Sequence, residues 1–238
     1  MPNIIHIETS TSVCSAALSS DGAVQCHFEN FEGPSHASLL GVYVEQIMDF
    51  SRDKGVKVDA VAVSSGPGSY TGLRIGVSVA KGLCFGFGIP LIGIHTLDIM
   101  AATACSKGDS QIVSITDDCL YCAMLDARRM EVYAAIYDAS LKPVRETKAD
   151  IVEAGTYASY LEKGKVCFFG NGASKCKPVI TSPNAIFIED IHPLAVNMIP
   201  LSEQAFAAGK FEDTAYFEPF YLKEFQATVA KNKVLLAR

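Results

Sequence analysis

The most constraining feature of the sequence is a pattern of apolar segments that occurs twice along the chain. In the first half, three strand-like segments precede a helix, a strand, a helix, a strand and a helix, with expected bounds 4–7, 13–18, 24–28, 35–52, 58–64, 72–87, 91–94 and 96–105. The second half shows a related order, with expected bounds 111–116, 120–125, 131–137, 152–162, 166–169, a short helix after 170–172, 185–188 and 194–208. We therefore expect two α/β units of one topology.

A duplicated βββαβα unit is the organisation of the actin, sugar kinase and Hsp70 class. In that class, abbreviated ASKHA, two ribonuclease-H-like domains face each other across a cleft. The polar pair Lys107-Gly108 predicts the boundary between an N-terminal domain, 1–107, and a C-terminal domain, 108–238. For segment 214–238 two placements stay open, one with the second domain and one packed back on the first.

Composition excludes several classes of protein. The chain has 238 residues, of which 49% are hydrophobic and 19% charged, as in a folded globular protein. Its net charge of −6 argues against binding a nucleic acid without a partner. Eight cysteines with no secretory signal predict reduced core thiols, and the Cys119 to Cys122 pair lacks the second half of a zinc site. No apolar run reaches membrane-spanning length, so we expect a cytoplasmic protein without membrane contact.

The most distinctive stretch, SSGPGSYTGLRIG at 64–76, predicts a strand end that turns into a helix. Such a turn presents backbone N–H groups to an anion, with Gly66 and Gly68 at its centre. Thr71 stands where a dinucleotide-binding motif needs glycine, and the Gly-Lys-Ser/Thr of a P-loop is absent. Two interpretations stay open, an anion site and a turn that the glycines merely shape.

A candidate cleft lies near the end of the first strand, where Glu8, Thr9 and Ser10 precede a hairpin. In actin-type enzymes this hairpin cradles phosphate and the acidic residue helps to hold a metal–nucleotide complex. Two interpretations stay open for His36, at the start of the first helix: it lines this cleft, or it has only a structural role at the helix start. The second unit opens on 115–118 without a glycine-rich hairpin, so we expect no ATP site in this chain alone. No HxxxH, HExxH or GxSxG motif supplies a metal site or a nucleophile.

A stripe of small residues runs along the second expected helix. Glycine costs a helix ~1 kcal/mol relative to alanine, so two glycines on one face indicate a close neighbour. That neighbour is either the first helix, which carries Leu39 and Tyr43, or another protein chain. The stripe consists of Gly72, Gly76, Val79 and Leu83.

Several stretches, in order along nearly the whole chain, resemble the TsaB (YeaZ) family. The run GPGSYTGLRIG is highly specific, and the other stretches add to it. They are IHIETST at 5–11, His36 with Leu39-Leu40, SGPGSYTGLRIG at 65–76, AKGL at 80–83, DARRMEVY at 126–133, GNG at 170–172 and PFYLK at 219–223. The sequence departs from the family at Glu8, where Asp is common, and at Lys223, where Arg is usual.

The resemblance implies a role in making threonylcarbamoyladenosine, at the adenosine next to the anticodon in tRNAs that read codons beginning with A. It implies a non-catalytic accessory subunit that binds a TsaD-type catalytic subunit and a TsaE-type ATPase, and forms a homodimer in their absence. ATP and a divalent metal are then expected on the partners, and tRNA only through the complex. TsaD binds its metal through an HxxxH motif, and Thr96 and Met100 stand at those histidine positions here.

The resemblance also implies which surface contacts partners. Family members use the two helices of the N-terminal domain, so the expected interface is Leu39, Tyr43, Gly72, Gly76, Val79 and Leu83. Two alternatives stay open. One is a stand-alone enzyme of the ASKHA fold, a small-molecule kinase or a metallopeptidase-like enzyme, which the hydroxyl-rich hairpin after Glu8 favours. The other is a purely structural homodimer.

Overall fold

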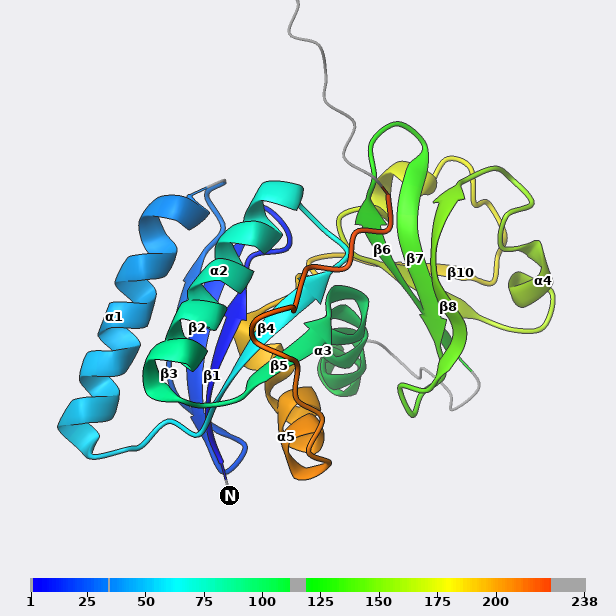
Figure 1. The fold of residues 1–238 in the computed structure, drawn as a ribbon. Helices are drawn as coiled ribbons and strands as arrows, with labels where there is room; N and C mark the ends of the chain where they lie inside the picture. Colours follow the sequence, from blue (N-terminus) through cyan, green and yellow to red (C-terminus); the bar gives the residue numbers. More distant parts are fainter. Residues whose placement is uncertain (1, 34, 112–118, 224–238) are drawn as a thin grey trace, which may run out of the picture.

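The computed structural model describes residues 2–33, 35–111 and 119–223 and contains two five-stranded mixed sheets (Figure 1). The strand order is β3-β2-β1-β4-β5 in the first sheet and β8-β7-β6-β9-β10 in the second. The first sheet comprises β1 (Asn3–Glu8), β2 (Cys14–Ser20), β3 (Ala23–Asn30), β4 (Ala60–Gly66) and β5 (Leu91–His95). The second comprises β6 (Leu120–Asp126), β7 (Glu131–Tyr137), β8 (Pro143–Ile151), β9 (Val166–Phe169) and β10 (Ala185–Ile188).

The two sheets have one topology. In each, three successive strands form an antiparallel meander, and the next two strands run parallel to the first strand of that meander. Parallel neighbours need a crossover connection, which α2 (Tyr70–Phe87) supplies between β4 and β5. The repeated order confirms the predicted α/β fold of the ASKHA class, with two ribonuclease-H-like units.

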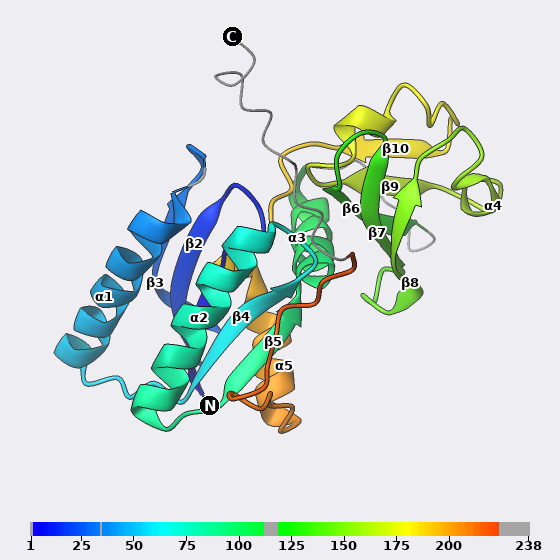
Figure 2. The same cartoon turned by 45° about the horizontal axis from the view of Figure 1, so that its top comes forward.

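Two helices cover one face of the first sheet. Helices α1 (His36–Lys54) and α2 lie side by side on it (Figures 1 and 2). Successive side chains of a strand point to opposite faces, so Ile5 and Ile7 of β1 enter the core beneath these helices, while Ile4 enters the core on the other face. That second core is closed by α5 (Ile199–Ala207), through Leu201, Ala205 and Phe206.

Helix α3 (Thr96–Gln111) lies between the two sheets (Figure 2). Its Ile99 packs with Ile4 of the first sheet, whereas Leu97 and Met100 pack with Phe169 of the second. The hydroxyl of Tyr137 on β7 donates a hydrogen bond to Asp98 Oδ1 at 2.6 Å. One helix therefore contributes to the cores of both units.

The second unit differs from its expected elements in several places. Residue 111, expected to begin a strand, lies at the end of α3, and the rest of that expected strand falls largely in 112–118, outside the described residues. The third strand of the meander is instead β8, whose alternate residues are charged and exposed, so it lacks an apolar signal. Only Ala158–Leu161 (α4) of the expected helix at 152–162 is α-helical.

Two further segments that were expected to form helices differ from that expectation in length or type. The segment after Gly170-Asn171-Gly172 forms a single 3₁₀ turn, Ser174–Cys176. The expected helix at 194–208 is divided into a 3₁₀ helix, Ala195–Met198, and α5, where Pro200 fits the first helical turn because its missing N–H is not needed there.

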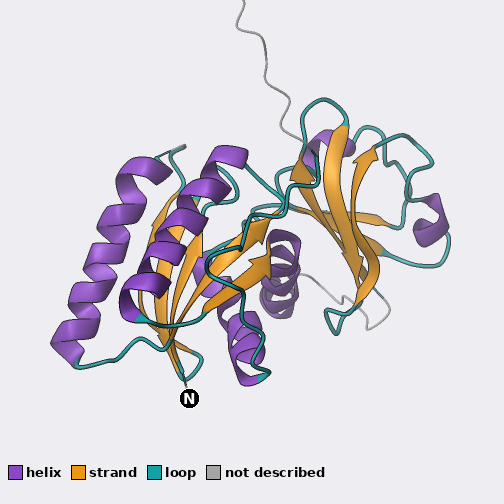
Figure 3. Ribbon diagram, viewed as in Figure 1, coloured by secondary structure: helices purple, strands orange, loops and turns teal. Residues whose placement is uncertain are grey.

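After α5 the chain returns along the first sheet as a strap, defined here as residues 212–223. Apart from one bridge to β5 it has no helix or strand (Figure 3). Glu212 N donates to Leu91 O at 2.9 Å and Phe220 N to Ser65 O at 2.7 Å, while Lys81 Nζ donates to the carbonyl of Phe217 at 3.1 Å. The described part of segment 214–238 therefore packs on the first unit.

Lys107 and Gly108 lie within α3, so the polar turn expected there is not formed. The division into domains 1–107 and 108–238 stays a prediction. Among the described helices, none combines the length and apolar character that a membrane span requires.

Candidate functional site

The glycine-rich loop after β4 packs directly on the end of β1. Ser69 N donates to Ser10 O at 2.6 Å, and Thr9 Oγ1 donates to Gly72 O at 2.8 Å. A Cβ at Gly68 would stand 2.3 Å from Ser10 O, and Gly66 adopts a φ of +109°. Glycine is thus required here by close backbone approach and by a left-handed conformation. The structure shows the glycines shaping a turn that packs against the hairpin, and the anion site stays a prediction.

The serine at the end of this loop starts α2. Ser69 is the N-cap, and its side chain accepts a hydrogen bond from Gly72 N at 3.2 Å. This cap satisfies one of the amide groups that an anion would otherwise meet at the helix start.

The candidate cleft residues do not converge on one space. Glu8 and Thr9 are neighbours on a strand end, so they face opposite sides of the sheet: Thr9 contacts α2, and Glu8 lies on the α3 side. His36 Nε2 donates to Thr11 O at 2.7 Å, and this bond ties the start of α1 to the hairpin. His36 is therefore engaged in a structural contact, although its Nδ1 has no partner among the described residues.

Glu8 is a fully buried carboxyl group. Ser10 N donates to its Oε1 at 2.5 Å, and its Oε2 has no hydrogen-bond partner among the described residues. Burial raises the pKa of Glu8 to about 7, although hydrogen bonds from Ser10 and Ser64 act to lower it. Because burial disfavours the charged form, the neutral acid of Glu8 persists to higher pH than that of an ordinary glutamate.

The positions aligned with the catalytic metal motif hold buried side chains. Thr96 and Met100 are fully buried, and Met100 packs with Leu97 in the core of the second unit. A hydroxyl and a thioether are poor ligands for Zn²⁺ or Fe. Within the described ranges no group of three His, Cys, Asp or Glu side chains is arranged to hold a metal ion.

Two of the six residues of the expected partner-contacting surface, Gly72 and Gly76, are buried in the structure. A Cβ at Gly72 would stand 2.1 Å from Thr9 O, and one at Gly76 would stand 2.3 Å from Thr9 Oγ1. The nearest neighbour of both glycines is thus the end of β1, and His36 at the start of α1 also approaches Gly72, with its Cδ2 3.0 Å from such a Cβ. These two glycines face inward and cannot themselves contact a partner in this structure.

The other four residues of that surface are half-buried. Tyr43 stacks on Phe28 of β3 with ring centroids 5.5 Å apart, and Val79 and Leu83 pack on the core beneath α2. Leu39 is half-buried as well. The exposed large apolar side chains of these helices are others: Phe85 is 89% exposed, Phe87 is 56% exposed and Val42 is 44% exposed. None of the three was predicted from the sequence.

Two cavities lie near the carboxyl ends of the second sheet's parallel strands. The first, of about 360 Å³, is lined by Gly170 and Asn171 after β9 and by Glu189 and His192 after β10. The second, of about 330 Å³, is also lined by His192 and by Phe31. The Phe31 and His192 rings are packed in a T-shaped arrangement with their centroids 5.5 Å apart. Neither is lined by the candidate cleft residues at the end of β1.

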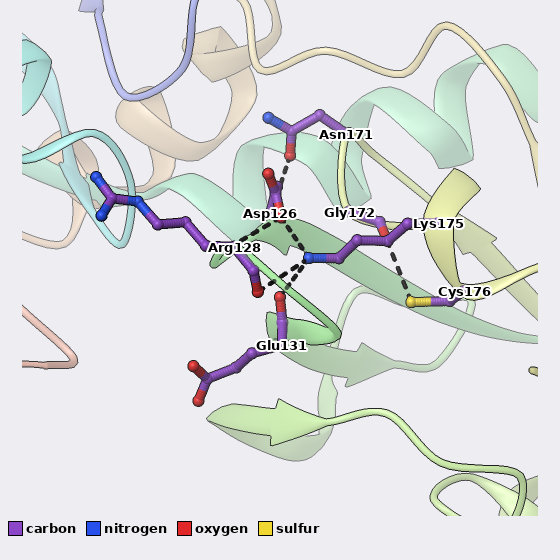
Figure 4. A network of polar contacts seen from close by, with 7 residues as sticks. All are labelled: Asp126, Arg128, Glu131, Asn171, Gly172, Lys175 and Cys176. Atoms are coloured by element: carbon purple, nitrogen blue, oxygen red, sulfur yellow. Dashed lines mark hydrogen bonds and ion pairs between the residues drawn. The ribbon is translucent and has the colours of Figure 1, made fainter.

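Lys175, in the segment after β9, forms polar contacts with the β6–β7 turn (Figure 4). Lys175 Nζ donates to Glu131 O at 2.6 Å and pairs with Asp126 Oδ1, and Asp126 N donates to Asn171 Oδ1 at 2.9 Å. A Cβ at Gly172 would stand 2.8 Å from Leu125 C, so the GNG loop must contain glycine to approach β6. This loop is held by contacts within the protein.

Comparisons with known proteins agree on one family. Residues 32–231 match the family model described as TsaD, tRNA N6-adenosine threonylcarbamoyltransferase. The tRNA threonylcarbamoyladenosine biosynthesis protein TsaB of Escherichia coli is 32% identical over 227 residues, covering 92% of this chain and 94% of the relative. The protein of the same description from Haemophilus influenzae is 34% identical, covering 55% of this chain and 51% of the relative.

A solved structure supports the same relationship. YeaZ from Pseudomonas aeruginosa superposes with a TM-score of 0.75 at 26% identity, covering 93% of this chain and all of that chain.

Proposed function

The chain belongs to the TsaB (YeaZ) family of tRNA threonylcarbamoyladenosine biosynthesis proteins, and we propose that it is a non-catalytic accessory subunit of the complex that makes this modification. In this proposal it binds a TsaD-type catalytic subunit and a TsaE-type ATPase in the cytoplasm. ATP and the divalent metal are held by these partners, and tRNA is engaged only in the assembled complex. In their absence the chain forms a homodimer.

The observation that carries the non-catalytic role is the closure of the hairpin after β1. Two hydrogen bonds join the hairpin to the loop after β4: Ser10 O accepts from Ser69 N, and Thr9 Oγ1 donates to Gly72 O. Glu8, the acidic residue of this hairpin, is fully buried, and its Oε1 accepts a hydrogen bond from Ser10 N. A kinase that used this cleft would need to open the loop first.

Exposed apolar side chains on α1 and α2 support the accessory role. Val42 lies on α1 and Phe85 on the neighbouring α2, and both side chains are exposed. A partner that covered them would remove apolar surface from water, which favours association. We therefore assign partner binding to the outer surfaces of these helices, next to the half-buried Leu39, Tyr43, Val79 and Leu83.

The test is threonylcarbamoyl transfer to tRNA in a reconstituted mixture of the TsaD-type and TsaE-type partners, the adenylate donor and ATP, with and without this chain. We expect transfer to depend on the chain, and chain washed with a metal chelator to restore transfer as fully as untreated chain. Equal transfer without the chain would contradict the accessory role.

A calorimetric titration distinguishes the accessory subunit from a stand-alone kinase. The isolated chain should release no heat with magnesium-ATP at concentrations of roughly 100 µM, the range of weak binding. Saturable heat would favour a nucleotide site in this chain.

A further inference from the structure

An aromatic–cationic surface lies where the strap meets the β6–β7 turn. It combines side chains from three elements far apart in sequence, the start of α2, the β6–β7 turn and the end of the strap. Its members are Tyr70, Arg74, Arg128, Arg129, Tyr221 and Lys223, and all are exposed or half-buried.

The members are linked by direct contacts. The Arg74 guanidinium lies 5.0 Å from the centroid of the Tyr70 ring, and the Tyr70 and Tyr221 rings are 5.0 Å apart. Lys223, two residues after Tyr221, pairs with Glu131 Oε1. Glu131 N in turn donates to Arg128 O at 3.0 Å, so the surface continues from α2 to the β6–β7 turn.

The turn presents its arginines outward. Arg128 and Arg129 adopt left-handed φ values of +69° and +46°, and the Lys175 network holds the backbone of this turn. Figure 4 shows the Arg128 guanidinium pointing away from that network. The held backbone places two solvent-exposed arginines side by side at one turn.

The charge balance leaves this surface cationic. The carboxylates of the turn are already paired, Asp126 with Lys175 and Glu131 with Lys223. Within the described ranges no carboxylate pairs with Arg74, Arg128 or Arg129. Burial, the largest cause, raises the pKa of Tyr221, the Arg74 charge lowers that pKa, and Tyr70 also raises it. One acidic residue, Glu218, lies close enough to this surface to raise the pKa of Tyr221 as well.

Arginines beside tyrosine rings match the chemistry of single-stranded nucleic acid. Arginine binds phosphate through paired N–H groups, and an exposed ring stacks on a base of any sequence. An acidic peptide would engage the arginines but leave the rings unused. The net charge of −6 limits the affinity of the isolated chain but not the position of the contact.

We propose that this surface binds a single-stranded loop of RNA, with Arg128 and Arg129 on phosphates and the Tyr221 ring on a base. This inference rests on the proposed function, in which tRNA is the substrate of the assembled complex. It names the part of this chain that touches the RNA.

The test measures binding of a fluorescent RNA hairpin that carries an anticodon loop to the chain assembled with its TsaD-type and TsaE-type partners, over a salt series. Arg128→Asn with Arg129→Asn removes two cations and keeps residues that tolerate positive φ. We expect about tenfold weaker binding at low salt and a salt slope smaller by roughly 1.4, the value for two phosphate contacts on a single strand. Tyr221→Ala should weaken binding about fivefold or more, and Tyr221→Phe should not.

Matched controls separate this surface from general charge. Lys142→Asn with Lys163→Asn removes two exposed cations elsewhere on the second unit and should leave binding unchanged. The Arg128→Lys, Arg129→Lys variant keeps the charges but lacks the paired N–H groups, so it should bind more tightly than the Asn variant and more weakly than wild type. Thermal melting of each variant establishes that it is folded.

Several outcomes would overturn the inference. They are an unchanged affinity of the folded Asn variant, an equal loss in the lysine control, tighter binding of fully paired RNA than of the hairpin loop, or a loss of partner binding in place of RNA binding. The transfer assay keeps the two proposals apart. If transfer needs the chain but the Asn variant has an unchanged KM for tRNA and unchanged RNA binding, the surface is wrong and the accessory role stands.

Discussion

At the scale of single residues, Glu8 makes stability depend on pH in an unusual direction. Its pKa is raised from 4.5 to about 7 by burial, so the folded state binds more protons than the unfolded state between these values. The stability from neutral Glu8 is fully present below pH 4.5 and is lost as the pH rises through 7.

Glu8→Gln keeps the acceptor for Ser10 N and removes this titration. Above pH 7 we expect the variant to be more stable than wild type by on the order of 3 kcal/mol, with the difference vanishing below pH 4.5. Urea unfolding at several pH values measures it. Burial also lowers the pKa of His6 to about 3, which destabilises both proteins in acid and cancels in the comparison. A difference that is constant with pH would mean that folding does not shift the pKa of Glu8.

Two glycines of α2 should respond oppositely to the same substitution. Gly76→Ala places a Cβ 2.3 Å from Thr9 Oγ1, which is buried and bonded to Gly72 O, so we expect a loss of about 1–3 kcal/mol from overpacking. Gly82→Ala meets nothing within 4 Å and should gain roughly 0.5–1 kcal/mol from helix propensity. Chemical denaturation gives both values. A neutral Gly76→Ala would show that β1 and α2 can separate at little cost.

At the scale of elements, α2 has two faces with separate tasks. Its inner face meets β1, and its outer face exposes Phe85. Phe85→Asp should therefore weaken co-elution with the TsaD-type subunit at least tenfold without lowering the melting temperature, because the side chain is already solvated. Ile151→Asp, which is also at an exposed apolar position but on β8, should co-elute normally. Analytical gel filtration compares them. Equal behaviour of the two variants would place the partner elsewhere.

How far the elements could be predicted depended on how apolar they are. Strand β7 was predicted with its observed bounds, because it is a short continuous apolar run and a turn precedes it. Strand β8 was missed because it is an edge strand with charged alternate residues, which carries no burial pattern. The glycine stripe correctly indicated a close neighbour, but periodicity does not say which element approaches. The opposite faces of Glu8 and Thr9, in contrast, follow from strand alternation and were available from the sequence.

At the scale of the whole molecule, α3 couples the two units. Met100 is fully buried in the second unit's core, while Ile99 of the same helix lies in the core of the first. Met100→Ala should cost about 2–5 kcal/mol. Because α3 cannot detach from one core alone, hydrogen exchange should show lower protection of β1–β5 and of β6–β10 together. Faster exchange confined to β6–β10 would show that the units unfold independently.

The return of α5 to the first sheet has a consequence for the order in which the protein is made. Ribosomes add roughly 5–20 residues per second, and N-terminal parts generally fold first. Here the face of the first sheet around Ile4 and Ile92 is covered by Met198, Leu201 and Phe206, which emerge after all of β6–β10. The N-terminal half therefore waits for several seconds or more with an uncovered apolar face, during which a nascent chain depends on a chaperone or on its own ribosome to avoid aggregation.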